Sequence, residues 1–148
     1  MITYCTNIHP GESWGEIFSN IKTNVIAVRN AVSPNEPFPV GLRLSNKAVR
    51  EMNNDVSQRF QDWLEEKGCY IPTINGFPYA SFHRPGLKEG VYLPDWRSEE
   101  RAVYTMLLTD LLASWLPEGM RGSISTVPVG FRTRIGREDY PAVRRNLL

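Results

Sequence analysis

Residues 69–83, with the sequence CYIPTINGFPYASFH, mark a point where a strand turns into a loop. The segment begins as a short apolar run with β-branched and aromatic residues, which is typical of a buried strand. It then changes to NGFP at 75–78 and continues with polar and aromatic side chains as far as His83. Because Asn-Gly tolerates positive φ and proline fixes the exit direction, we expect this strand to leave its sheet through a short arch that forms a site.

The length and composition indicate a single globular domain over residues 1–148. The chain is 41% hydrophobic and 22% charged, which is ordinary usage for a globular protein with a real core. Its formal net charge is +1, so nucleic acid is not an expected partner, because binding to a polyanion requires a clear basic excess. No apolar run approaches the roughly twenty residues of a membrane helix, and we therefore expect no membrane insertion.

The two cysteines, Cys5 and Cys69, are too few for a disulfide framework, and no basic and apolar signal segment precedes Thr3. We therefore expect reduced thiols in a cytoplasmic protein. Both cysteines lie in predicted strands, where a buried thiol acts as a small apolar group. Neither is paired with a local base, so we do not expect catalysis by a thiolate.

Strand and helix patterns alternate four times along the chain. Short apolar runs predict strands at 2–8, 38–44, 69–75 and 123–129. Apolar side chains at spacings of three and four predict helices at 14–32, 46–52, 56–64, 98–116 and 138–148.

Local signals support several of these boundaries. Ser13 and Glu16 form a capping box ahead of the first helix, and Asn-Asn-Asp at 53–55 interrupts the second helical region. Pro72 lies inside the third strand, where its missing N–H costs one ladder bond. Residues 84–96 show neither the period of a helix nor that of a strand, which predicts a long excursion over the end of the sheet.

Alternation of this kind implies parallel strands joined by right-handed crossovers. No glycine-rich dinucleotide fingerprint and no Walker-type phosphate loop follows any strand. The unusual polar loops all follow strands, as expected for a (β/α) barrel, whose sites lie at the carboxyl ends of the strands. A full barrel needs eight units and about 250 residues. We therefore predict an α/β fold of four parallel units, which is half of a TIM-type barrel.

An open half barrel exposes the inward face of its strands and leaves two edge strands unpaired. We therefore predict that the chain is a fragment or a truncated relative of a longer protein, or that it associates with a second copy or with a complementary half.

Five separated motifs resemble the family called metabolite traffic protein EboE. They are YCTNIHPGESW at 4–14, GLRLS at 41–45, TINGFPY at 73–79, VYLPDW at 91–96 and GSISTVPVGF at 122–131. The family is placed among the xylose-isomerase-like TIM barrels, and the resemblance covers only the amino-terminal part of its longer barrel. It implies a sugar-isomerase-like scaffold linked in bacterial operons to the handling or export of a small metabolite.

The resemblance also bears on catalysis and cofactors. In xylose-isomerase-like barrels a divalent metal ion is held largely by residues from the second half of the barrel, so no ligand set can be carried over to this chain. A complete barrel would be a metal-dependent sugar isomerase or epimerase, whereas this chain alone is expected to be inactive. The alternatives are a non-catalytic metabolite-binding or carrier module and an inactive truncated fragment.

The expected ligand is a small polar metabolite, a sugar or sugar phosphate, bound at the carboxyl ends of the strands. The candidate ligand-binding residues lie in loops or at strand ends and are His9, Arg43, Asn75, Tyr79, His83, Lys88, Tyr92, Asp95 and Thr126.

Several of these residues have a second interpretation. His9 and His83 are candidate metal ligands, but structural roles fit them better, and hydrogen bonding to substrate is a third interpretation. Arg43 either clamps an anionic group of the ligand or pairs with a carboxylate such as Glu12. Asn75 either binds sugar hydroxyls or closes the Asn-Gly turn on its own backbone.

The remaining candidates belong to the long excursion and to the last strand. Lys88, Tyr92 and Asp95 would form a lid over the site, while Trp96 anchors the loop in the core. Thr126 is a polar wall residue of the pocket or an ordinary strand end.

Overall fold

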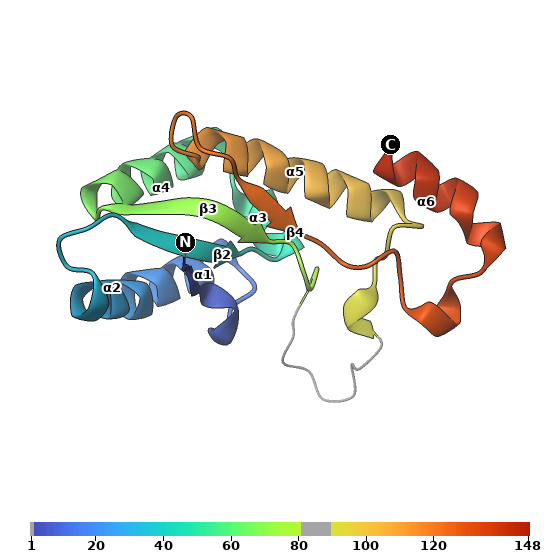
Figure 1. Cartoon of the computed structure of the whole chain (residues 1–148), viewed down its shortest axis with the longest axis horizontal. Helices are drawn as coiled ribbons and strands as arrows, with labels where there is room; N and C mark the ends of the chain where they lie inside the picture. The colour runs from blue at the N-terminus through green and yellow to red at the C-terminus, as the bar shows by residue number, and fades with distance from the viewer. Residues whose placement is uncertain (1, 81–89) are drawn as a thin grey trace.

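The computed structural model describes residues 2–80 and 90–148. Its centre is a parallel sheet in which four strands lie in the order β1-β2-β3-β4 (Figure 1). Every neighbouring pair is parallel, and the strands are β1 Tyr4–Cys5, β2 Phe38–Arg43, β3 Cys69–Asn75 and β4 Ser123–Ser125. The predicted α/β fold of four parallel strands alternating with helices is confirmed.

Helices fill the connections between the strands. The main helical segments are α1 Trp14–Asn20, the π-helical η2 Ile21–Val25, α2 Ile26–Val32, α3 Asn46–Glu51, α4 Asn54–Glu66, α5 Glu99–Trp115 and α6 Tyr140–Leu147. Short 3₁₀ turns occur at η1 Thr6–Ile8, η3 Gly90–Tyr92, η4 Arg132–Arg134 and η5 Arg137–Asp139.

Polar side chains cap the helices where the sequence indicates. Ser13 and Glu16 form the predicted capping box at the start of α1. Ser45 caps α3 by accepting a bond from the Ala48 N–H, and Asn53 caps α4. Because each cap satisfies an amide that lacks an intrahelical partner, the break between α3 and α4 is fixed locally.

The first and fourth strands are shorter than predicted because side chains bond the backbone that would extend them. After Cys5 the chain turns into η1, and Thr6 Oγ1 accepts the bond from the Arg43 N–H at 2.8 Å. After Ser125 the carbonyl of Val127 accepts the indole N–H of Trp96 at 3.1 Å.

Pro72 is accommodated by an irregularity in the ladder between β2 and β3. Pro39 pairs with Tyr70 and Gly41 pairs with Thr73, so two residues of β3 lie opposite Val40 alone. Such a bulge leaves one residue unpaired, and this removes the ladder bond that proline could not make.

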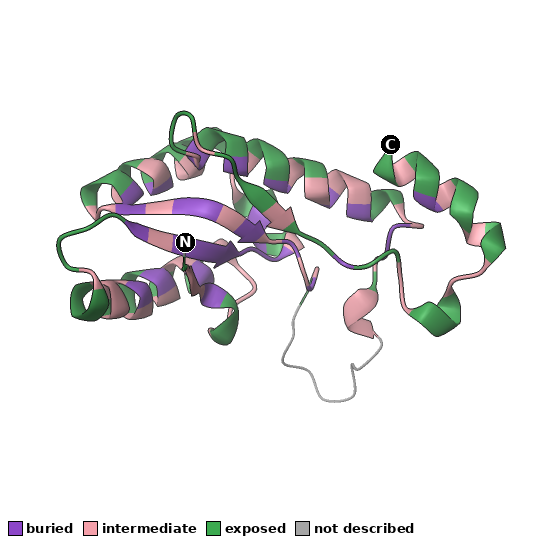
Figure 2. Ribbon diagram, in the orientation of Figure 1, coloured by how far each residue is buried: buried purple, intermediate pink, exposed green. Residues whose placement is uncertain are grey.

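One face of the sheet carries the main core. A single cluster of buried residues joins strand side chains such as Val40, Leu42 and Ile74 to residues of α1, η2, α3, α4 and α5. Figure 2 shows burial concentrated on β2, β3 and the inward sides of these helices. These helices therefore cover the same face of the sheet.

A second, smaller cluster lies beside the amino end of α5. It joins Trp96, Val127 and Val143, so it fixes α6 and the segment after β4 to the start of α5. Asn146 reinforces this by donating to the carbonyl of Trp96 at 3.0 Å. The predicted anchoring role of Trp96 is confirmed, since its side chain is 6% exposed.

No helix in residues 2–80 and 90–148 combines the length and apolar character that crossing a membrane would require.

Phe60 is the centre of the aromatic part of the core. Its ring contacts those of Trp14, Phe18, Trp63 and Trp115, and its side chain is 1% exposed. We predict that Phe60→Ala lowers the free energy of unfolding by about 3–5 kcal/mol, because it leaves a cavity at this junction. Urea denaturation followed by circular dichroism measures the change.

The matched control is Met106→Ala on the outer face of α5, where the side chain is 60% exposed. It should change stability by less than about 0.5 kcal/mol. An equal effect of both substitutions would contradict the assignment of Phe60 to the centre of the core.

Candidate functional site

The face of the sheet opposite the main core carries small and polar residues. Register partners on neighbouring strands share a face, and two such rows are Cys5, Gly41, Thr73 and Ser123, and then Arg43, Asn75 and Ser125. The second row lies at the carboxyl edge of the sheet.

Asn75 is the centre of the second row. Its amide nitrogen donates to Cys5 Sγ at 3.2 Å, and its amide oxygen accepts from the Ser125 hydroxyl at 3.0 Å. A bond from Asn75 to Cys5 passes over β2, where the residue paired with Cys5 is Gly41. The absence of a side chain on Gly41 therefore leaves a shallow, hydrogen-bonded surface across three strands.

The neighbouring row is bonded in the same way. The Ser123 hydroxyl donates to Thr73 Oγ1 at 2.9 Å, and Thr73 Oγ1 donates to the carbonyl of Ser123 at 3.0 Å. Ser123 and Ser125 are exposed, and Thr73 is half-buried. The open face thus presents neutral donors and acceptors that water or a hydroxylated molecule can reach.

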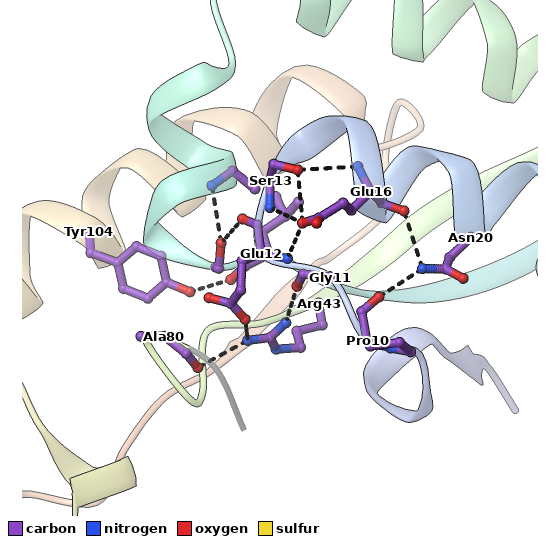
Figure 3. A network of polar contacts seen from close by, with 12 residues as sticks. Pro10, Gly11, Glu12, Ser13, Glu16, Asn20, Arg43, Ala80 and Tyr104 are labelled. Atoms are coloured by element: carbon purple, nitrogen blue, oxygen red, sulfur yellow. Dashed lines mark hydrogen bonds and ion pairs between the residues drawn. The ribbon is translucent and has the colours of Figure 1, made fainter. Parts of the chain in front are cut away.

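Arg43 points out of this row into the loops that follow β1 and β3. Its guanidinium donates to the carbonyls of Gly11 at 2.9 Å and Ala80 at 3.1 Å, and it forms an ion pair with Glu12 at 3.0 Å (Figure 3). The side chain is 7% exposed, and Nε has no hydrogen-bond partner. The structure therefore contains the Glu12 pair that was one of the two interpretations of this residue.

Figure 3 shows that the β1 loop is itself braced by hydrogen bonds. Ser45 Oγ donates to the carbonyl of Glu12 at 2.5 Å, and the Asn20 amide donates to the carbonyl of Pro10 at 2.7 Å. Arg43 therefore meets a loop that is already held at both ends.

His9 lies beside Arg43 in this loop. Its Nε2 is 2.8 Å from the Tyr4 hydroxyl, and together with Thr6, Arg43 and Asn20 it lines a small cavity of about 10 Å³. This volume is near that of a single water molecule, so the cavity is too small for a sugar. In the structure His9 is thus hydrogen-bonded to another side chain of the protein, that of Tyr4.

Arg101 is a buried arginine that the sequence patterns did not single out. Its side chain is 0% exposed, Nε donates to the carbonyl of Pro94 and Nη1 donates to the carbonyl of Gly76, both at 2.8 Å. The guanidinium lies 5.4 Å from the ring centres of Tyr79 and Tyr104, and Nη2 has no partner. Burial lowers its pKa, which favourable interactions with the two tyrosines partly oppose.

The sequence did hold a signal for Arg101. The residue lies three and seven positions before Tyr104 and Leu108, which are buried on the same stripe of α5. A charged side chain on an apolar helix stripe is rarely buried without a specific set of partners.

Gly76 begins the arch after β3, and its role is to provide space. It is absent from the glycines with positive φ, which differs from the expectation for an Asn-Gly turn. A Cβ atom there would lie 2.8 Å from Leu108 Cδ1 and from the carbonyl oxygen of Ser125. The close approach lets the Gly76 N–H donate to Ser125 O at 2.9 Å, so the arch is fixed to β4.

Tyr79 is partly buried and packs against the main core. Its ring packs edge-on against Tyr104 at 5.0 Å between centroids, and its carbonyl accepts from the Asn46 N–H at 2.9 Å. Tyr104 in turn donates its hydroxyl to the carbonyl of Leu44 at 2.5 Å.

Among the described residues, no hydrogen bond, ion pair or ring contact joins Tyr92, Asp95 or Thr126 to Asn75. Tyr92 packs against Phe77 and Phe131. Asp95 is 3% exposed and accepts two bonds from the Arg97 guanidinium, at 3.0 and 2.8 Å. Thr126 is exposed just beyond the end of β4.

The other two candidates, His83 and Lys88, lie outside the described residues. Within residues 2–80 and 90–148, no group of three or more His, Cys, Asp and Glu side chains is placed to hold a metal ion. The described residues alone thus do not fit the divalent metal site of a xylose-isomerase-like barrel, and we derive no chemical step through a metal.

Comparison with known proteins adds no relative. No protein-family model, no curated protein sequence and no solved structure matches this chain.

The hydroxyl of Tyr104 provides a test of the buried polar contacts. We predict that Tyr104→Phe lowers the free energy of unfolding by about 1–3 kcal/mol, because the carbonyl of Leu44 loses its buried donor. Tyr140→Phe is the control, since Tyr140 is 57% exposed, and it should be nearly neutral. Equal stability of Tyr104→Phe and wild type in thermal unfolding would contradict the contact.

Glu16 provides a test by pH. Hydrogen bonds from the backbone N–H groups of Ser13 and Glu12 lower the pKa of Glu16 from 4.5 to about 2. A carboxylate with a lowered pKa in the folded state contributes stability above pH 4.5, and this contribution is lost as pH falls towards 2. We predict that wild type exceeds Glu16→Gln in stability near neutral pH and that the difference shrinks across this interval.

Urea titrations of both proteins at a series of pH values give this difference directly. A difference that stays constant down to the acid end of the series would show that ionisation of Glu16 does not contribute.

Proposed function

We propose that the chain forms four βα units of a xylose-isomerase-like barrel, similar to the EboE family, and binds a small polar metabolite at the carboxyl ends of its strands. The ligand class is a sugar or a sugar phosphate, and the role is the handling or export of that metabolite.

The direction of winding supports this assignment. The strands follow one another as β1-β2-β3-β4 without reversal, and α1, α4 and α5 share one core on one face. In doubly wound folds the strand order reverses and helices cover both faces. Winding in one direction is what a (β/α) barrel requires.

The single observation that carries the binding proposal is the set of hydrogen bonds that joins Cys5, Asn75 and Ser125 near the carboxyl edge. An asparagine amide has two N–H groups and two lone pairs on its oxygen, so Asn75 keeps capacity for further bonds after the two it makes here. Adjacent hydroxyl and amide groups of this kind suit the alternating donors and acceptors of a polyol.

A complementary half would supply what these residues lack. In the proposal, the partner units contribute the metal ligands and the acid and base groups of an isomerase, and they cover the polar face. The strands β1 and β4 are the two edges at which a second copy or such a half would pair. This chain alone should then show no sugar isomerisation, with or without a divalent metal.

A metabolite carrier is the second candidate, and the neutral character of Cys5, Asn75 and Ser125 favours it. Hydroxyl and amide groups can hold a polyol without a metal, so binding that is independent of metal would favour the carrier. Binding that requires metal would favour the isomerase.

We predict that a panel of aldoses, ketoses, polyols and their phosphates contains a ligand that shifts the backbone amide signals of Asn75 and Ser125 in NMR spectra. Asn75→Ala should weaken its binding roughly tenfold or more, because one lost hydrogen bond to a polar ligand costs about that much. Each titration is repeated with Mg²⁺ and with a chelator.

The control variant is Asn30→Ala, which removes an exposed asparagine from α2. It should leave the affinity unchanged. The proposal fails if no panel member shifts the two amides, or if Asn75→Ala binds its ligand as tightly as wild type.

A further inference from the structure

Helix α6 and the segment after β4 form a groove that the main core and the open sheet face do not use. It has a volume of about 650 Å³ and is lined by both buried and exposed residues of α6. The lining comes from two short stretches, 129–135 and 140–148. Figure 1 shows α6 at the end of the molecule away from α2, and Figure 2 shows that most of its surface is exposed.

The groove collects apolar side chains that are exposed to water. Val129, Tyr140, Leu147 and Leu148 are between 42% and 93% exposed, and all four line it. Across the described residues only five other large hydrophobic side chains are exposed to a similar degree, and none of those lines the groove. A concave apolar hollow of this volume falls within the range of small-molecule sites.

The segment that forms the groove carries an excess of positive charge. Residues 129–148 contain five arginines against Glu138 and Asp139, although the whole chain carries only +1. Arg132 and Arg144 line the groove, and Arg137 and Arg145 line an adjoining hollow of about 700 Å³ that shares Tyr140 and Arg144 with it.

One of the two acidic residues, Asp139, is bonded elsewhere in the fold. Asp139 Oδ2 lies 3.6 Å from Arg97 Nη1 and accepts a hydrogen bond from the Gly136 N–H. Its carboxylate therefore already has partners within the fold. Arg132 and Arg144 are exposed, and neither forms an ion pair with a residue in the described parts of the chain. Their guanidinium groups are therefore available to a ligand.

We propose that this groove binds a small anionic amphiphile, a molecule with a carboxylate or phosphate head and an apolar body. The apolar body lies along Val129, Tyr140 and Leu147, and the head bonds to Arg132 and Arg144, because a guanidinium fork matches either anion. The volume of about 650 Å³ suits one small molecule. This site shares no residue with the proposed metabolite site at the carboxyl edge of the sheet. The two proposals can therefore be tested independently.

Three probes with the same apolar body separate the contributions of charge and of burial. Decanoate, decanol and decyltrimethylammonium are titrated below the concentrations at which they form micelles, and amide shifts are followed by NMR. We expect decanoate to shift the signals of Tyr140, Val143 and Leu147. It should bind roughly tenfold or more tightly than decanol, since the arginines bond only the anion, and the cation should bind more weakly still.

Substitutions then assign the head and the body. The double variant Arg132→Gln with Arg144→Gln should reduce decanoate binding to the level of decanol, and Leu147→Asp should weaken all binding to the groove. The controls are Arg121→Gln and Met106→Ser, an exposed arginine and an exposed hydrophobic residue outside the groove, and neither should change the affinity. Thermal unfolding confirms that each variant is folded.

The outcomes that overturn the proposal are distinct. Equal binding of decanoate and decanol would show that the arginines recognise nothing, and tighter binding of the cation would contradict the charge argument. Sedimentation with anionic lipid vesicles without binding of free decanoate would assign the surface to a membrane instead. Shifts confined to other parts of the chain would place the ligand elsewhere.

Discussion

Two buried arginines hold the carboxyl edge of the sheet, and the rest of the site depends on them. Arg43 bonds carbonyls of both the β1 loop and the arch after β3, and Arg101 bonds the arch and the segment before α5. Each places several donors of one planar group against carbonyls from different segments. Loops that lie far apart in the sequence are thereby given a defined position, at the cost of burying two charges.

The two faces of the sheet therefore differ in composition. Apolar residues of β2 and β3 join the helices on one face, while the other face presents the bonded rows around Asn75 and Thr73. Gly41 and Gly76 matter because both permit close approach, the first under the Asn75–Cys5 bond and the second beside α5. The polar face is therefore positioned by the same packing that forms the core.

Much of this fold could be predicted because its signals are local. The capping box at Ser13 and the boundaries of β3 follow from neighbouring residues, whereas the length of β1 depends on Thr6, which bonds a strand 37 residues away. The site was harder to predict for the same reason. Asp95 resembles a lid residue in sequence but is buried against Arg97, and Arg101 contacts the arch after β3, which lies more than 20 residues away in the chain.

Hydrogen exchange at the arch tests most directly whether the arginines hold this edge. The amides of Gly76 and Asn46, which bond Ser125 and Tyr79, should exchange as slowly as the amides within β3 in the wild-type chain. In Arg101→Met both should exchange much faster while the amides of α4 keep their rates. Fast exchange of these two amides in wild type, or unchanged exchange in the variant, would contradict the account.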